Sequence, residues 1–155
     1  MLLVDTSVWI EVFRKPAGVR LDRVVDFDDV VTCLPVVQEV LQGFRNEQAF
    51  QTARDAMYAL PMIASPMSQQ VFDTGIDLYR RARRAGYTVR SSSDCLIAAC
   101  AITHTMPVLH KDRDFDLLAK ISTLEARRIS KYPSGAALPR SPGLIQCRRE
   151  LLRSL

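Results

Sequence analysis

Short apolar runs alternate with helical stretches along most of this chain, and this alternation restricts its fold more than any other feature. The apolar runs cover residues 2–4, 30–33, 107–110 and 123–129, with a weaker run behind a proline at 61–64. The helical stretches cover residues 8–13, 20–27, 36–44, 46–60, 65–85, 94–105 and 113–120. Strands that alternate with helices form βαβ units around a mostly parallel sheet. The pattern therefore predicts an α/β fold, a three-layer α/β/α sandwich.

The composition is that of an ordinary globular domain. A chain of 155 residues suits a single domain, and 48% hydrophobic with 25% charged residues is enough for a core. No apolar run is long enough for a membrane span, and Asp5 interrupts the N-terminal run, so we expect a cytoplasmic protein without a signal peptide. The cysteines lack the spacing of a zinc site or a disulfide framework. We expect reduced, mostly buried thiols at Cys33, Cys95, Cys100 and Cys147.

The positive charge is concentrated at the C-terminal end of the chain. From Ala126 onward there are seven Lys and Arg and one Glu, whereas residues 1–125 have fourteen Lys and Arg against sixteen Asp and Glu. Residues 1–130 are expected to form a slightly acidic domain whose net charge does not itself indicate nucleic-acid binding. Residues 131–155 contain a Pro- and Gly-rich linker and a basic segment. We expect a disordered tail there, with a docked helix or an RNA-attracting extension as alternatives.

Five acidic residues stand near the predicted strand ends or at the start of buried helices: Asp5, Glu39, Asp94, Asp112 and Asp114. The first directly follows a strand, and the last two follow the strand at 107–110. In an open parallel sheet, ligands bind outside the carboxyl ends of the strands. We therefore expect these side chains to meet at one edge of the sheet.

Each acid alone also has a simpler explanation. Asp5 suits an N-cap, Asp94 in a first helical turn would gain ~0.3–1 kcal/mol from the helix dipole, and Glu39 could face solvent. Clustered carboxylates, however, repel one another and raise their pKa values, so a cluster at neutral pH needs a cation. Oxygen ligands favour Mg²⁺ or Mn²⁺. Such an ion polarises a phosphoryl oxygen and activates water, while Glu39 or Asp114 could orient that water as a base.

Four blocks of sequence carry this pattern: LLVDTSVWIE, VVQEVLQGF, RSSSDCLIAACA and LHKDRDFDLLA. In this order they resemble the PIN-domain nucleases, and within them the short VapC-like toxins of bacterial toxin–antitoxin pairs. The resemblance covers residues 1 to about 129 and implies a parallel-sheet α/β/α sandwich. It also implies RNA cleavage that depends on Mg²⁺ or Mn²⁺, and a homodimer held inactive by a cognate antitoxin. The family pattern does not explain residues 131–155.

Carried over by position, the resemblance implies a catalytic quartet of Asp5, Glu39, Asp94 and Asp112. The implied metal ligands are Asp5, Asp94 and Asp112. Asp114 is a further candidate, and the sequence leaves open whether it or Asp112 completes the ligand set. Ser7 would support Asp5, and Arg90 and Ser93 would lie at the rim, where a cation and backbone N–H groups meet phosphate. The four arginines between 80 and 84 suit RNA contact and a solvated helix face equally well.

Other proteins with an aspartate after the first strand fit this chain less well. A phosphatase with an aspartyl nucleophile usually has a second acid two residues on, where this chain has Ser7. A receiver domain needs an acid pair at the place where Asp5 stands alone. The serious alternative is a non-catalytic PIN-like scaffold that binds RNA or protein. Packed carboxylates give a scaffold no benefit, so we expect a metal-dependent endoribonuclease that acts as a toxin.

Overall fold

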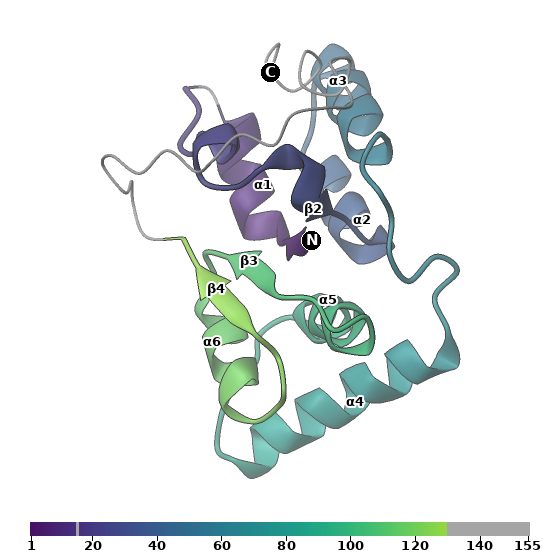
Figure 1. Cartoon of the computed structure of the whole chain (residues 1–155), viewed down its shortest axis with the longest axis vertical. Coiled ribbons are helices and arrows are strands. Elements are labelled where there is room, and N and C mark those ends of the chain that lie inside the picture. Colours follow the sequence, from purple (N-terminus) through teal and green to yellow (C-terminus); the bar gives the residue numbers. More distant parts are fainter. Residues whose placement is uncertain (15, 130–155) are drawn as a thin grey trace.

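A sheet of four short parallel strands lies at the centre of the computed structural model, which describes residues 1–14 and 16–129 (Figure 1). The strands are β1 (Leu2–Val4), β2 (Val30–Val31), β3 (Val108–His110) and β4 (Ala126–Arg128). Their order in the sheet is β2-β1-β3-β4, and every pairing is parallel. In the central strand, Leu3 lies opposite Val31 on one side and Val108 on the other.

Six α-helices connect and flank these strands in the described part of the chain. They are α1 (Thr6–Phe13), α2 (Leu34–Gln42), α3 (Glu47–Tyr58), α4 (Gln69–Arg84), α5 (Ser92–Thr103) and α6 (Arg113–Lys120). Side-chain oxygens of Asp5, Asn46, Ser91 and Asp112 accept a backbone N–H and cap α1, α3, α5 and α6. The chain leaves α4 through Gly86, whose φ of 77° suits a residue without Cβ.

Helix α5 is buried on nearly every side, as its apolar sequence predicts. It lies alongside α4, the longest helix in the described part of the chain (Figure 1). The close approach of the two helices depends on Gly75, where an added Cβ would lie 3.3 Å from the Leu96 side chain and 3.4 Å from the Cys95 carbonyl oxygen. On α1, Trp9 is fully buried and its indole N–H donates to the Val4 carbonyl at 3.2 Å. The core therefore fixes the first turns of both α1 and α5.

The chain leaves the two central strands in opposite directions. From β1 it passes through α1 to β2, and from β3 it passes through α6 to β4. Because parallel crossovers are right-handed, these connections cover opposite faces of the sheet, which gives the predicted three-layer sandwich. The point between the carboxyl ends of β1 and β3 is a topological switch point, where open α/β sheets bind ligands. Asp5 and Asp112 lie just beyond these two strand ends.

The predicted helix at 20–27 is wrong. The segment instead forms two 3-10 turns, at Leu21–Arg23 and Phe27–Asp29. Between them lie two β-branched valines, and the Asp26 carboxylate accepts the N–H of Asp28 at 3.2 Å. β-Branched residues and local side-chain bonds to the backbone both compete with a regular helix.

The weak strand at 61–64 is reduced to an isolated bridge between Thr32 and Met62. Pro61 has no N–H to donate, and Ala64 has a φ of 51°, so extended pairing cannot continue on either side. Helix α4 also begins at Gln69, later than residue 65, because residues 63–66 form bends and Ser68 has an extended backbone.

Residues 131–155 lie outside the described part of the chain, so the predicted tail remains a prediction. Cys33, Cys95 and Cys100 are buried and free, as expected, while Cys147 also lies outside the described residues. Over residues 1–14 and 16–129, no helix combines the length and the apolar character needed to cross a membrane.

Candidate active site

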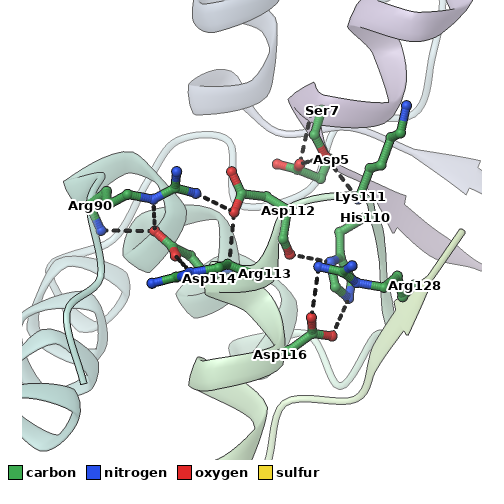
Figure 2. A network of polar contacts seen from close by, with 10 residues as sticks. All are labelled: Asp5, Ser7, Arg90, His110, Lys111, Asp112, Arg113, Asp114, Asp116 and Arg128. Atoms are coloured by element: carbon green, nitrogen blue, oxygen red, sulfur yellow. Dashed lines mark hydrogen bonds and ion pairs between the residues drawn. The ribbon is translucent and has the colours of Figure 1, made fainter. Parts of the chain in front are cut away.

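Asp5 lies directly beyond β1 and is only 2% exposed. Its Oδ2 accepts the backbone N–H of Ser7 at 2.9 Å and also accepts the Ser7 hydroxyl. Ser7 Oγ in turn accepts the N–H of Lys111 at 2.9 Å, which ties the end of β1 to the loop after β3 (Figure 2). Within residues 1–14 and 16–129, the buried Oδ1 of Asp5 has no hydrogen-bond partner. Oδ2 of Asp5 therefore caps α1, while Oδ1 has its lone pairs available for a ligand.

Asp112 and Asp114 share one cation, Arg90 (Figure 2). Arg90 Nη2 lies 2.6 Å from Asp112 Oδ1, and Arg90 Nε lies 3.3 Å from Asp114 Oδ2. The backbone N–H of Arg90 also donates to Asp114 Oδ2 at 2.8 Å. The Asp114 side chain is fully buried, whereas those of Asp112 and Arg90 are 33% and 59% exposed. Asp114 therefore anchors Arg90 from inside, and Asp112 borders the accessible side.

Glu39 is held by hydroxyl groups from two other helices. Thr6 Oγ1 donates to Glu39 Oε2 at 2.7 Å, and the Ser93 hydroxyl donates to Glu39 Oε1. Thr6 follows Asp5 at the start of α1, and Ser93 precedes Asp94 at the start of α5. Glu39 on α2 thereby joins the first turns of the two helices that carry these aspartates.

Asp94 brings a further carboxylate to this cluster from the first turn of α5. Burial is the main reason why its pKa is raised to about 7. Four neighbouring carboxylates raise that pKa further: Asp5, Asp112, Glu39 and Asp114. Burial likewise raises the pKa of Asp5 to about 6, despite the hydrogen bonds from Ser7 that lower it. The structure thus brings all five predicted acids close enough to influence protonation at one point.

This donor set fits a hard divalent cation better than any other common ligand. Its atoms are carboxylate oxygens, and two of them, Asp5 Oδ1 and Asp114 Oδ1, are buried without a hydrogen-bond partner in the described residues. Burial and neighbouring carboxylates raise the pKa values of Asp5 and Asp94, so these two acids are hard to ionise without a cation. No three acidic, His or Cys side chains among residues 1–14 and 16–129 converge closely enough to form a finished ion site. Asp112 and Glu39 are turned instead towards Arg90 and the hydroxyls of Thr6 and Ser93.

Three contributors to this site were not found by sequence reasoning. Thr6 is separated from its partner Glu39 by 33 positions, and Lys111 Nζ lies 2.7 Å from Glu11 Oε1 across 100 positions. The third is His110, which is fully buried with Nδ1 2.6 Å from the Asp112 carbonyl oxygen. Burial lowers the pKa of His110. Only the position of Thr6 beside Asp5 gave a sequence signal for any of these contacts.

Comparison with known proteins places this chain in a family. The PIN domain family matches residues 2–121 of the chain. The chain is 38% identical over 131 residues to a protein named ribonuclease VapC11 from Mycobacterium tuberculosis. The matched region covers 81% of this chain and 97% of that protein.

Two solved structures have the same fold at low sequence identity. VapBC2 from Rickettsia felis, bound to a DNA fragment from its promoter, matches with a TM-score of 0.68 and 15% identity over 83% of this chain and 98% of that chain. VapBC-5 from Mycobacterium tuberculosis, a member of a family of toxin–antitoxin systems, matches with a TM-score of 0.64 and 21% identity over the same shares of the two chains. With its acids gathered at the switch point of the sheet, the chain belongs to the PIN-domain family and is a VapC-like member of it.

Proposed function

We propose that this protein is a metal-dependent endoribonuclease that acts as the toxin of a toxin–antitoxin pair. The observation that carries the proposal is the pairing of Asp94, whose pKa is raised to about 7, with Asp5, which keeps a buried oxygen without a partner in the described part of the chain. A bound cation would relieve both features. The ribonuclease name of the 38% identical relative supports RNA as the substrate.

The proposed ion is Mg²⁺, with Mn²⁺ as a substitute, held by Asp5, Asp94 and Asp112. When bound, it would polarise the scissile phosphate and lower the pKa of a coordinated water. Ser7 keeps the Asp5 carboxylate in one orientation through two hydrogen bonds. Glu39 accepts hydrogen bonds from the hydroxyls of Thr6 and Ser93, and its proposed role is to accept a proton from the attacking water.

Arg90 is the proposed phosphate contact at the rim of the site. Asp114 holds its backbone and its Nε, which leaves the exposed end of the guanidinium near Asp112. A guanidinium fixed in this way can exchange its bond to Asp112 for a phosphate oxygen with little loss of side-chain entropy. Asp112 would then be free to bind the ion. One movement of Arg90 would therefore both contact the phosphate and release Asp112.

An antitoxin protein is the proposed partner, because related solved structures are toxin–antitoxin complexes. We place both partners in the cytoplasm, where the RNA substrate is found. We further propose a homodimer through α4, whose exposed side carries three large apolar side chains, Phe72, Ile76 and Tyr79. The acids at 73 and 77 lie on the N-terminal side of the arginines that occupy the last turns of α4. Two antiparallel copies of α4 would therefore pair opposite charges along an apolar stripe.

Ion binding is the direct test of the proposal. Calorimetric titration with Mn²⁺ compares wild type with Asp5→Asn, which keeps the helix cap because Asn is as good an N-cap as Asp. Asp55→Asn, on the exposed side of α3, is the matched control for loss of one negative charge. We expect binding by wild type and by the control, and a loss of at least tenfold in affinity for Asp5→Asn.

RNA cleavage by the same three proteins completes the test. Cleavage should require the added ion and should disappear with Asp5→Asn while the control remains active. If folded wild type binds RNA but no Mn²⁺, the protein is a non-catalytic scaffold and the nuclease proposal fails.

A further inference from the structure

His110 is the last residue of β3 and one of the few polar side chains that the core buries completely. Its ring packs against Phe115, with the ring centroids 5.3 Å apart. Nε2 makes no hydrogen bond within the described residues, and the carboxylate oxygen Oδ1 of Asp116 lies 3.5 Å away. Burying an unsatisfied polar atom costs ~1–3 kcal/mol, a cost that a leucine in this place would avoid. Stability alone therefore does not account for a histidine at this position.

The hydrogen bond that the ring does make reaches the backbone of Asp112. Nδ1 lies 2.6 Å from the Asp112 carbonyl oxygen. A carbonyl oxygen can only accept, so Nδ1 must carry the hydrogen. The bond spans a single residue, Lys111, and closes the turn in which β3 ends and α6 begins (Figure 2).

This turn is fixed at each of its three residues. The Lys111 N–H donates to Ser7 Oγ at 2.9 Å, and the Asp112 side chain accepts the Asp114 N–H at 3.0 Å. The His110 ring holds the carbonyl of Asp112. Because that carbonyl and the Asp112 side chain share one Cα, the direction of the carboxylate depends on the ring.

A charged pair closes the far side of the ring. Asp116 on α6 lies 3.5 Å from Nε2 and forms an ion pair at 2.9 Å with Arg128 of β4. Figure 2 shows the imidazole between the Asp112 backbone and this pair. The ring is therefore confined by β4 on one side and by the ligand-bearing turn on the other.

We propose that His110 is a positioning residue, whose Nδ1–H fixes the turn that presents Asp112 to the divalent ion. The inference rests on the proposed function, since it takes Asp112 as a ligand. His110 itself touches neither ion nor substrate. Its contribution is a fixed backbone, and its loss would weaken ion binding by letting the Asp112 carboxylate turn away.

The experiment uses two substitutions of similar polarity. In His110→Asn the amide nitrogen falls at the place of Nδ1, whereas in His110→Gln it falls at the place of Nε2. His104→Gln changes the other histidine, at the far end of α5, and is the matched control. Calorimetry with Mn²⁺ on the folded full-length proteins gives the affinity, and circular dichroism gives the melting temperature of each without added ion.

We expect His110→Gln to bind Mn²⁺ about tenfold more weakly than wild type or worse, in line with the effect of losing an outer partner of a metal ligand. His110→Asn should restore most of that affinity, although both variants melt at lower temperature than wild type. Equal affinity in all variants, or equal loss in Asn and Gln, overturns the inference while leaving the metal site intact. Failure of wild type to bind Mn²⁺ overturns the proposed function itself.

A measurement on the unmodified protein guards against variants that fail to fold. Long-range ¹H–¹⁵N correlation of the imidazole identifies which ring nitrogen carries hydrogen. The expected spectrum has a protonated and hydrogen-bonded Nδ1 in His110. An Nδ1 without hydrogen would refute the role of this bond whatever the variants show.

Discussion

Arg90 and Asp112 form an ion pair, 2.6 Å between Nη2 and Oδ1, across the accessible side of a cluster of carboxylates. The pair stands where the proposed ion and the RNA phosphate would meet. Arg90 is thus a cation that already balances part of the acidic charge. Ion binding and the Arg90–Asp112 contact should therefore compete.

Arg90→Gln should change ion binding and RNA cleavage in opposite directions. Removing a positive charge next to Asp112 should tighten Mn²⁺ binding by roughly threefold to tenfold, since charges at such distances interact by ~1 kcal/mol or more. Cleavage should fall at least tenfold, because the fixed phosphate contact is lost. Calorimetry and a cleavage assay give the two values, with Arg54→Gln on α3 as the control. Weaker ion binding in Arg90→Gln would mean that Arg90 supports the acids instead of competing for them.

Asp112 and Asp114 should respond differently to loss of charge. Asp112→Asn should weaken Mn²⁺ binding at least tenfold with a small change in stability, because its side chain borders the accessible side. Asp114→Asn should lower the free energy of unfolding by ~1–3 kcal/mol, since it removes the buried acceptor that holds the Arg90 backbone and guanidinium. Urea unfolding and calorimetry separate these effects. If Asp114→Asn instead lost Mn²⁺ affinity and Asp112→Asn lost stability, Asp114 would be the ligand and Asp112 the residue that anchors Arg90.

Without divalent ion, the protein should become less stable as the pH rises. Folding raises the pKa of Asp5 from 3.8 to about 6 and that of Asp94 from 3.8 to about 7. At a pH between the unfolded and the folded pKa values, the folded chain therefore binds more protons than the unfolded chain. Stability is then greatest below the unfolded pKa and is lost as the pH rises through the folded values. Melting temperatures in chelator should fall from about pH 4 to about pH 8 and then level off.

One substitution and one added ion test the cause of this pH dependence. Asp94→Asn removes the acid with the larger rise in pKa and should flatten the curve. Saturating Mn²⁺ should also flatten it, because the ion stabilises the ionised acids in the folded state. A curve that is unaffected by either change would point to titrating groups elsewhere in the protein.

Ile76→Asp should dissociate the proposed homodimer. It places a charge in the middle of the exposed apolar side of α4, between Phe72 and Tyr79. Tyr58→Asp, an exposed apolar side chain at the end of α3, is the matched control. Light scattering after size exclusion should give a monomer for Ile76→Asp and a dimer for wild type and the control. A dimer in all three would place the contact on another surface.

The sequence contained enough information to locate the acids but not their hydrogen bonds. Strand ends in a parallel sheet share one edge, so the positions of Asp5 and Asp112 after apolar runs placed them near each other in advance. Glu39 and Asp94 were predicted from their places in an otherwise uncharged helix and at the start of the apolar helix at 94–105, and the PIN resemblance then assigned their roles. The different environments of Asp112 and Asp114 depend on which side of α6 is covered by the Arg90 loop, and two residues of spacing do not reveal that.

The errors in the fold prediction arose where local and tertiary effects compete. At 20–27 the polar periodicity suggested a helix, but the Asp26 side chain starts a separate short turn. His110 looked like an ordinary strand residue because its partner is a backbone carbonyl, and backbone acceptors leave no trace in the sequence. The contact of Thr6 with Glu39 likewise depends on how α2 packs against α1.

Ser7→Ala should weaken the site through geometry while all of its acids remain. The Ser7 hydroxyl donates to Asp5 and accepts the N–H of Lys111, so it links the end of β1 to the residue that follows β3. Its removal leaves the Lys111 N–H without this acceptor and should lower the free energy of unfolding by ~1–2 kcal/mol. Mn²⁺ affinity should fall by about tenfold, because Asp5 and Asp112 would no longer be held at a fixed separation.

Ser7→Thr is the conservative counterpart, since it keeps the hydroxyl and should retain most of the Mn²⁺ affinity. Ser122→Ala, which removes a hydroxyl bonded to the Leu118 carbonyl beyond α6, controls for the general effect of losing a hydrogen bond. Urea unfolding should show a comparable loss of stability in Ser122→Ala, while calorimetry should show unchanged Mn²⁺ affinity. If Ser7→Ala also binds Mn²⁺ as wild type does, the hydroxyl link stabilises the fold without setting the geometry of the acids.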